Sequence, residues 1–160
     1  WSGLYELSAG SHNWHFQKNE RGIYGAPDPS MRVAVLRGGA MLSGRAVLDD
    51  MHVAAESVLG VDCLQRTAGE SLSPGDMCHE LIFDVTANAT DFFITVRSPG
   101  RFAIFTEHWP KEFDAVEIGT AGAMVGPLAT FVHEESHGAD DSQHTHEPDH
   151  EHEHEHEHEH

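Results

Sequence analysis

The stretch Phe92–Glu107 reads FFITVRSPGRFAIFTE and consists of two apolar runs on either side of Ser98-Pro99-Gly100. Both runs are rich in aromatic and β-branched residues, which favour strands, whereas serine, proline and glycine together are typical of a turn. We therefore predict two strands, Phe92–Arg97 and Arg101–Glu107, joined directly as a β-hairpin.

Shorter runs of the same kind lie upstream, separated by glycine, proline and polar residues. Apolar side chains such as Met31, Val33 and Val35 recur at every second position, so that one face of the run is apolar. Short strands of this kind favour an antiparallel β-sandwich. The runs that we predict as further strands are Leu4–Ser8, His12–Gln17, Met31–Arg37 and Glu80–Val85.

The segment Arg45–Leu59 departs from this pattern because its apolar residues recur at helical spacing. Ser43 precedes it as a suitable N-cap, and Gly60 follows it as a residue type that ends helices. We predict one amphipathic helix laid over the sandwich. Its apolar residues are Val47, Leu48, Met51, Ala54, Ala55, Val58 and Leu59.

The chain has 160 residues with 27 acidic and nine basic side chains, which is a formal net charge of −18. This charge argues against nucleic acid and against an anionic membrane surface as partners, since both are bound through clustered Lys and Arg. No apolar run approaches the roughly 20 residues that a membrane span needs. We also find no phosphate-binding loop, HExxH sequence or nucleophile elbow, so we predict that the protein is not an enzyme.

The end of the chain differs in composition from the rest. Residues 133–160 hold ten of the 15 histidines and 11 acidic residues, without Lys or Arg. With almost no apolar side chain to bury, such a segment cannot offset the entropy of ordering its backbone. We predict a β-sandwich domain over residues 1–118, a Gly/Ala-rich hinge over residues 119–132 and a disordered tail over residues 133–160.

The tail is suited to binding metal ions. Neutral imidazoles are ligands for Zn²⁺, Ni²⁺, Cu²⁺ and Co²⁺, and at three or four per ion the tail could hold about two or three ions. We expect zinc. The terminal His-Glu repeat could instead be a purification tag, although the irregular sequence of residues 133–150 argues against this. The predicted ligands are His133, His137, His144, His146, His150, His152, His154, His156, His158 and His160.

The domain holds three further candidate ligands. His12, His79 and His108 lie at or just beyond predicted strand ends, each on the apolar face of its strand. Three imidazoles at neighbouring strand ends could form a metal site, with His108 and His79 as the preferred ligands. The alternative, which the sequence leaves open, is that each is a separate core or surface residue. His15 points to the opposite face and His52 lies on the predicted helix.

Two cysteines provide a clue to the cellular compartment of the protein. Cys63 and Cys78 could close one loop as a disulfide, which would indicate an oxidising environment, or they could be buried free thiols. The chain opens at Trp1 without a charged and apolar leader, which we interpret as a mature chain whose signal peptide has been removed. We expect a periplasmic or secreted protein.

The residues Ser98–His108, SPGRFAIFTEH, resemble the last hairpin of the cupredoxins, where a turn leads into an aromatic strand and a ligand loop. This resemblance implies a cupredoxin-like β-sandwich with a histidine at its rim. It does not extend to a blue-copper ligand set, because Glu107 rather than a cysteine precedes His108 and no methionine follows before Met124. In composition, the tail resembles the metal-binding segments of exported zinc- and nickel-handling proteins and metallochaperones.

We therefore expect a protein that captures, buffers or delivers divalent transition metal outside the cytosol, with a metal transporter or acceptor protein as its partner. The alternative is a β-sandwich interaction module that binds a protein or glycan. In that case the tail is a pH-responsive segment or partly a tag. A small metalloenzyme would require three domain ligands to converge, which the sequence does not establish.

Overall fold

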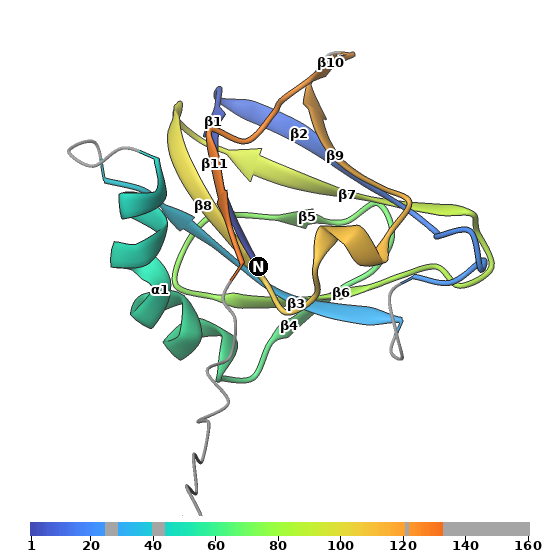
Figure 1. Cartoon of the computed structure of the whole chain (residues 1–160). Coiled ribbons are helices and arrows are strands. Elements are labelled where there is room, and N and C mark those ends of the chain that lie inside the picture. The colour runs from blue at the N-terminus through green and yellow to red at the C-terminus, as the bar shows by residue number, and fades with distance from the viewer. Residues whose placement is uncertain (25–28, 40–43, 121, 133–160) are drawn as a thin grey trace, which may run out of the picture.

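The computed structural model describes residues 1–24, 29–39, 44–120 and 122–132. This part of the chain contains eleven strands, one α-helix and one short 3₁₀ helix (Figure 1). In chain order the elements are β1 Ser2–Leu7, β2 Gly10–Gln17, β3 Ser30–Arg37, α1 Arg45–Leu59, β4 Leu64–Arg66, β5 Ser71–Leu72, β6 Cys78–Ile82, β7 Ala89–Val96, β8 Gly100–Thr106, η1 Pro110–Glu112, β9 Ala115–Thr120, β10 Ala123–Met124 and β11 Ala129–Phe131.

The strands form two sheets that pack against each other, which confirms the predicted β-sandwich. Sheet A has the order β11-β1-β8-β3-β6-β4, and sheet B has the order β10-β9-β2-β7-β5. Most neighbours are antiparallel, but the short strands β4 and β5 run parallel to β6 and β7. The main apolar core lies between the sheets and includes Trp14, Phe92 and Ile104.

The predicted hairpin over Phe92–Glu107 is wrong, although both of its strands exist. Strand β7 lies in sheet B between β2 and β5, whereas β8 lies in sheet A between β1 and β3. The turn at Arg97-Ser98-Pro99 therefore carries the chain from one sheet to the other. A turn motif specifies a reversal of direction, but it does not specify which sheet the next strand joins.

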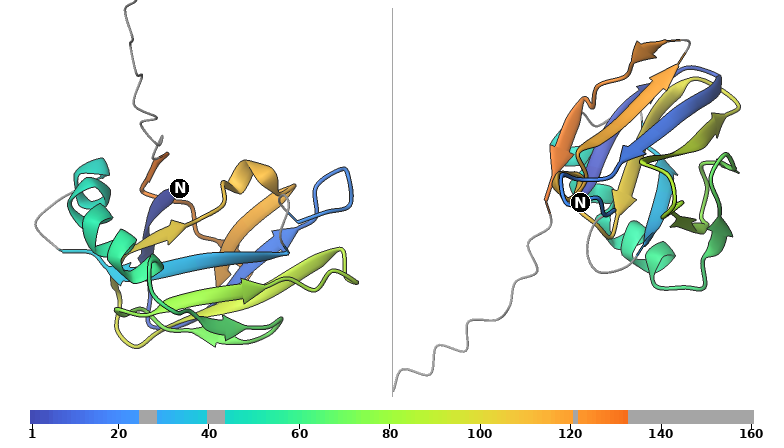
Figure 2. Two further views of the ribbon diagram at one scale, coloured as in Figure 1. Left: turned by 90° about the horizontal axis from the view of Figure 1, so that it is seen from below. Right: turned by 90° about the vertical axis from the view of Figure 1, so that its right-hand side faces the viewer.

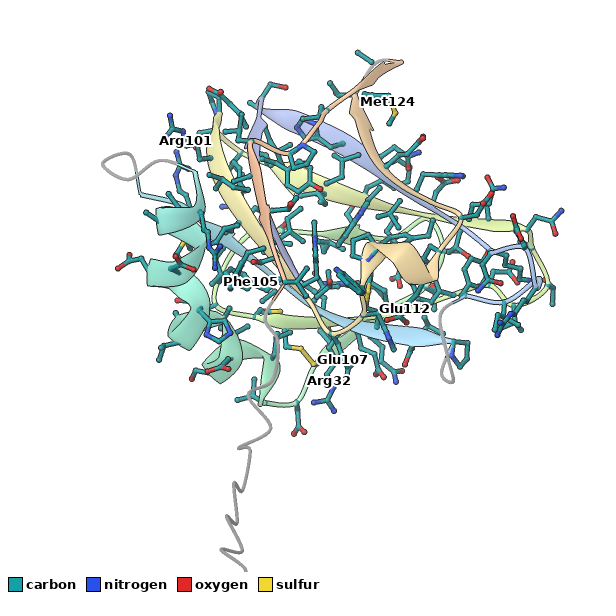
Figure 3. All side chains as sticks on the ribbon, in the orientation of Figure 1. Arg32, Arg101, Phe105, Glu107, Glu112 and Met124 are labelled. Carbon is teal, nitrogen blue, oxygen red and sulfur yellow. A yellow bond between two sulfur atoms is a disulfide. The ribbon has the colours of Figure 1, made fainter. Side chains whose placement is uncertain are left out.

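The different burial patterns of β7 and β8 explain why the two strands belong to different sheets. Alternate residues of β7 are buried, as expected for a strand with one face toward the core. Strand β8 is buried on both faces: Phe102 and Ile104 point into the core between the sheets, whereas Ala103 and Phe105 pack on the opposite side with residues of α1. Phe105 lies between β8 and α1 in Figure 3. In the described part of the chain this second cover is α1, which packs on strands of sheet A.

The helix has the predicted bounds, Arg45–Leu59, and covers the outer face of sheet A (Figure 2). Val47, Leu48 and Ala55 are buried in a second apolar cluster between α1 and the sheet. The predicted N-cap is not confirmed, because Ser43 lies outside the described residues and the cap position is Gly44, which makes no side-chain capping hydrogen bond. The molecule thus has three layers: helix, sheet A and sheet B.

The segment 119–132, which we expected to be a hinge, contains parts of the sandwich. The end of β9, the whole of β10 and the edge strand β11 fall within it. In β11, Phe131 pairs with Ser2 and Ala129 pairs with Leu4. The folded domain therefore extends at least to Phe131. The tail over 133–160 lies outside the described residues.

A disulfide joins Cys63 and Cys78, whose state the sequence left open; their Cα atoms are 4.5 Å apart. It fastens the chain just before β4 to the first residue of β6. In the described ranges there is also no helix with the length and apolar character that crossing a bilayer requires.

Candidate metal-binding histidines

The five histidines of the domain fall into two groups. Two of them, His12 and His79, are enclosed within the sandwich and are 1% and 2% exposed. The other three are more accessible, and each one contacts a carboxylate. The two groups differ in what their imidazoles can bind.

His12 belongs to the apolar core. It is the third residue of β2, and its side chain lies on the same inward face as Trp14 and Phe16, as the alternation predicted. Its Nε2 is 2.8 Å from the carbonyl oxygen of Ser8. Its Nδ1 is buried and has no hydrogen-bond partner among the described residues. The ring is therefore packed as a core residue and has no open side for an ion.

His79 has a similar environment in the other sheet. It is the second residue of β6, and it lies between Val33 of β3 and Leu64 of β4. Its Nε2 is 3.5 Å from the carbonyl oxygen of Ser73, and its Nδ1 is buried without a partner. Burial lowers the pKa of His79 because desolvation disfavours the charged ring. The imidazole is held neutral, but away from solvent.

His108 follows the end of β8 and is bound to the 3₁₀ helix. Its Nδ1 is 3.1 Å from Oε2 of Glu112, and its side chain is 16% exposed. The other oxygen of the Glu112 carboxylate, Oε1, accepts a hydrogen bond from the backbone amide of Trp109. Glu112 thereby fixes the loop and the ring together. Figure 3 labels Glu112 in η1, of which it is the last residue.

The structure does not bring the three predicted domain ligands together. His12 belongs to sheet B, His79 to sheet A, and His108 to the loop after β8. In the part of the chain that the structure describes, no three His, Cys, Asp or Glu side chains are grouped so as to hold a metal ion. The prediction was correct about which faces these residues share with apolar neighbours. It was wrong in expecting these positions to be accessible to solvent at the strand ends.

The two histidines that sequence reasoning set aside are the more accessible ones. His15 Nδ1 is 2.9 Å from Asp91 Oδ1, and His52 Nε2 is 3.4 Å from Glu56 Oε1. The His52 pair was readable from the sequence, because residues four apart are neighbours on a helix. The His15 pair depends on β2 lying beside β7, which are 76 residues apart at these positions.

The ten tail histidines fall outside the described residues, so their predicted role stays a prediction. The chain matches no protein-family model, no curated protein and no solved structure. The functional argument therefore depends on the sequence and on the chemistry of the described side chains.

Proposed function

We propose that this protein binds divalent transition metal ions, zinc above all, through residues 133–160, for capture, buffering or delivery outside the cytosol. The observation that carries this proposal is the composition of that segment, with ten histidines and 11 acidic residues among 28, and no Lys or Arg. Imidazoles supply the coordinating nitrogen atoms, and the carboxylates raise the local concentration of cations.

The state of the domain histidines supports assigning the main metal capacity to the tail. His12 and His79 are enclosed in the core, and His108 is bound to Glu112. None of the three contributes to a group of three ligand side chains within the described ranges. We therefore assign the binding of several ions to the histidine-rich segment.

The Cys63–Cys78 disulfide supports the proposed location outside the cytosol. Disulfides persist in oxidising compartments such as the periplasm and the extracellular space, and they are rare in the reducing cytosol. A metal transporter or an acceptor protein in the same compartment would then receive the ion.

Calorimetric titration of the full chain with zinc tests the proposal. The decisive variant keeps the chain length and changes all ten tail histidines to glutamine, from His133→Gln to His160→Gln. We expect the wild-type chain to bind about two or three ions by way of the tail, at three or four imidazoles per ion, and the variant to lose them. Unchanged stoichiometry in the variant would exclude the tail as the binding segment.

A second variant separates coordination from charge. It keeps the ten histidines and replaces the 11 acidic residues of the tail by their amides. We expect the number of bound ions to persist and the affinity to fall, because the amides remove the attractive field but not the imidazole nitrogens. Wild-type metal binding should also be lost toward pH 5, where imidazoles become protonated. If zinc has no effect on the wild-type chain at any pH, the interaction module is the better hypothesis.

A further inference from the structure

A row of three polar side chains crosses the outer face of sheet B. Strand β2 lies between β7 and β9, and His15 is directly opposite Asp91 on one side and Glu117 on the other. The neighbours of His15 along β2, Trp14 and Phe16, are buried in the core, so these three side chains point outward. Directly opposed residues in antiparallel strands have Cβ atoms about 4.5–5.5 Å apart.

Asp91 fixes the orientation of the His15 ring. Its Oδ1 accepts a hydrogen bond from Nδ2 of Asn13 at 2.9 Å and lies 2.9 Å from Nδ1 of His15. The oxygen that accepts from the Asn13 amide is thus also the acceptor that faces His15. Nδ1 of His15 must then be the nitrogen that carries the proton.

This tautomer leaves the other ring nitrogen, Nε2, with a lone pair. Nε2 of His15 makes no hydrogen bond to the described residues and is not enclosed, since the side chain is 29% exposed. The two ring nitrogens point in divergent directions, so Nε2 is directed away from Asp91. Glu117 lies on the opposite side of β2, is exposed, and makes no ion pair or hydrogen bond within the described ranges.

We propose that Nε2 of His15 and the carboxylate of Glu117 bind one divalent transition metal ion on the outer face of sheet B, with Asp91 as the positioning residue. Histidines that bind metal generally donate the other ring N–H to a carboxylate, which is the role that Asp91 has here. Zinc accepts imidazole nitrogen at about 2.0–2.1 Å and carboxylate oxygen at about 2.0–2.2 Å. Water occupies the remaining coordination positions.

The proposed site is consistent with the absence of a three-ligand group among the described side chains. It uses two protein ligands, since Asp91 contacts the ion only through His15. A site with two protein ligands exchanges its ion more readily than a closed four-ligand site, in which the protein occupies every position. The proposal is independent of the tail, because every residue in it belongs to the sandwich.

The other two histidine–carboxylate pairs of the described domain differ in geometry and exposure. Glu56 contacts Nε2 of His52 from the same helix face, and Glu112 contacts His108, whose side chain is only 16% exposed. Sheet register provides a second carboxylate for His15, on the side away from the first. This arrangement gives His15 both an orienting partner and a second ligand.

Nuclear magnetic resonance of the His15 ring nitrogens tests the proposal directly. The protein used is the full chain with the ten tail histidines changed to glutamine, so that tail-bound ions do not interfere. Before metal is added we expect a protonated Nδ1 and an unprotonated Nε2. Addition of zinc should shift the Nε2 resonance and saturate at one ion. A protonated Nε2, or an Nε2 signal that zinc does not move, would overturn the proposal.

Substitutions in the same background identify the partners. Glu117→Gln should weaken zinc binding at this site by about tenfold or more, and Asp91→Asn should weaken it by about 10–100-fold by releasing the ring. The matched control is Glu6→Gln, which removes one charge from an exposed position on β1 and should leave binding unchanged. Equal affinity in the Glu117→Gln and Glu6→Gln variants would contradict the assignment.

The outcome for Glu117 does not depend on the tail. Should the Glu117→Gln variant unfold at a lower temperature, Glu117→Asp provides the second measurement, because it keeps the charge and should retain most of the binding. Loss of zinc binding in the aspartate variant to the level of the glutamine variant would count against direct coordination. The two proposals are tested separately: a tail that does not bind zinc leaves the site at His15 intact, and loss of the His15 site leaves binding by the tail unaffected.

Discussion

The two sheets differ in what covers their outer faces. Sheet A carries α1 on its outer face, so that Ala34, Leu36 and Phe105 are buried on the helix side. Among the described residues no α-helix covers the outer face of sheet B, where the outward side chains of β2 are polar and at least partly exposed. The covered face contributes to stability, whereas the uncovered face leaves His15 and its carboxylate partners accessible. Figure 2 shows the helix on one side of the sandwich only.

The largest expected difference between the two faces comes from a matched pair of phenylalanines. Phe105→Ala removes a side chain that is 3% exposed between β8 and α1, and should cost about 3–5 kcal/mol of unfolding free energy. Phe93→Ala removes a half-buried side chain from the outer face of sheet B, and should cost well under half of that. Urea unfolding of both variants measures the difference. Equal losses would mean that the uncovered face is packed as well as the covered one.

The disulfide provides the next largest effect and also belongs to sheet A. Strand β4 pairs with β6 at three positions only, from Leu64 to Arg66, so the Cys63–Cys78 link supplies much of its attachment. The double variant Cys63→Ser, Cys78→Ser should lose on the order of 3 kcal/mol, the value expected for a loop of this length. Chemical reduction of the wild-type chain should give a similar loss. A loss below about 1 kcal/mol would indicate that β4 is held by its own contacts.

The difference between the sheets also explains how far the sequence predicts the fold. The spacing of apolar residues predicted α1 with its correct bounds and most strands of the sandwich. It did not predict that β7 and β8 belong to different sheets, since the turn between them specifies a change of direction and not a partner strand. The signal in the sequence was the unbroken apolar run Phe102–Phe105, which corresponds to the continuous burial of β8 and contrasts with the alternating burial of β7. Edge strands of two or three residues, such as β5 and β10, are too short to show a period.

The candidate site was harder to predict than the fold. The alternation along β2 correctly placed His12 with the apolar residues and His15 on the other face. The error lay in preferring the inward histidines. Strand β2 begins two residues before His12, and β6 begins one residue before His79, so both histidines lie within their strands and are buried. Pairing of His15 with Asp91 and Glu117 depends on sheet register between residues far apart in the chain. One sequence contains no direct record of that register.

A second matched pair compares the inside and the outside of one strand. His12→Ala removes a buried ring together with its 2.8 Å contact to Ser8, and should cost about 2 kcal/mol from lost packing and a lost hydrogen bond. His15→Ala lies three positions away on the exposed face and should cost less than about 1 kcal/mol, as exposed ion pairs do. Thermal and urea unfolding of the two variants provide the comparison. For zinc binding at the proposed site we expect the opposite order, with the larger loss in His15→Ala and the smaller in His12→Ala.

The smallest effect concerns pH and the buried ring of His79. Its pKa in the folded state is lowered from the ordinary value of 6.5, mainly because burial disfavours the charged ring. The unfolded chain therefore binds a proton that the folded chain does not, once the pH falls below about 6.5. The stability that the neutral ring provides is fully present above that pH and is lost as the pH falls toward the folded-state pKa.

One differential proton gives a slope of at most about 1.4 kcal/mol per pH unit, so the wild-type unfolding free energy should fall by about that amount or less between pH 6.5 and pH 5.5. His79→Leu removes the titrating ring while keeping an apolar side chain, and its unfolding free energy should fall less steeply over the same interval. Because the tail is present in both chains, its histidines affect both slopes alike. Identical slopes in the two chains would show that His79 accepts a proton within the folded sandwich at no cost.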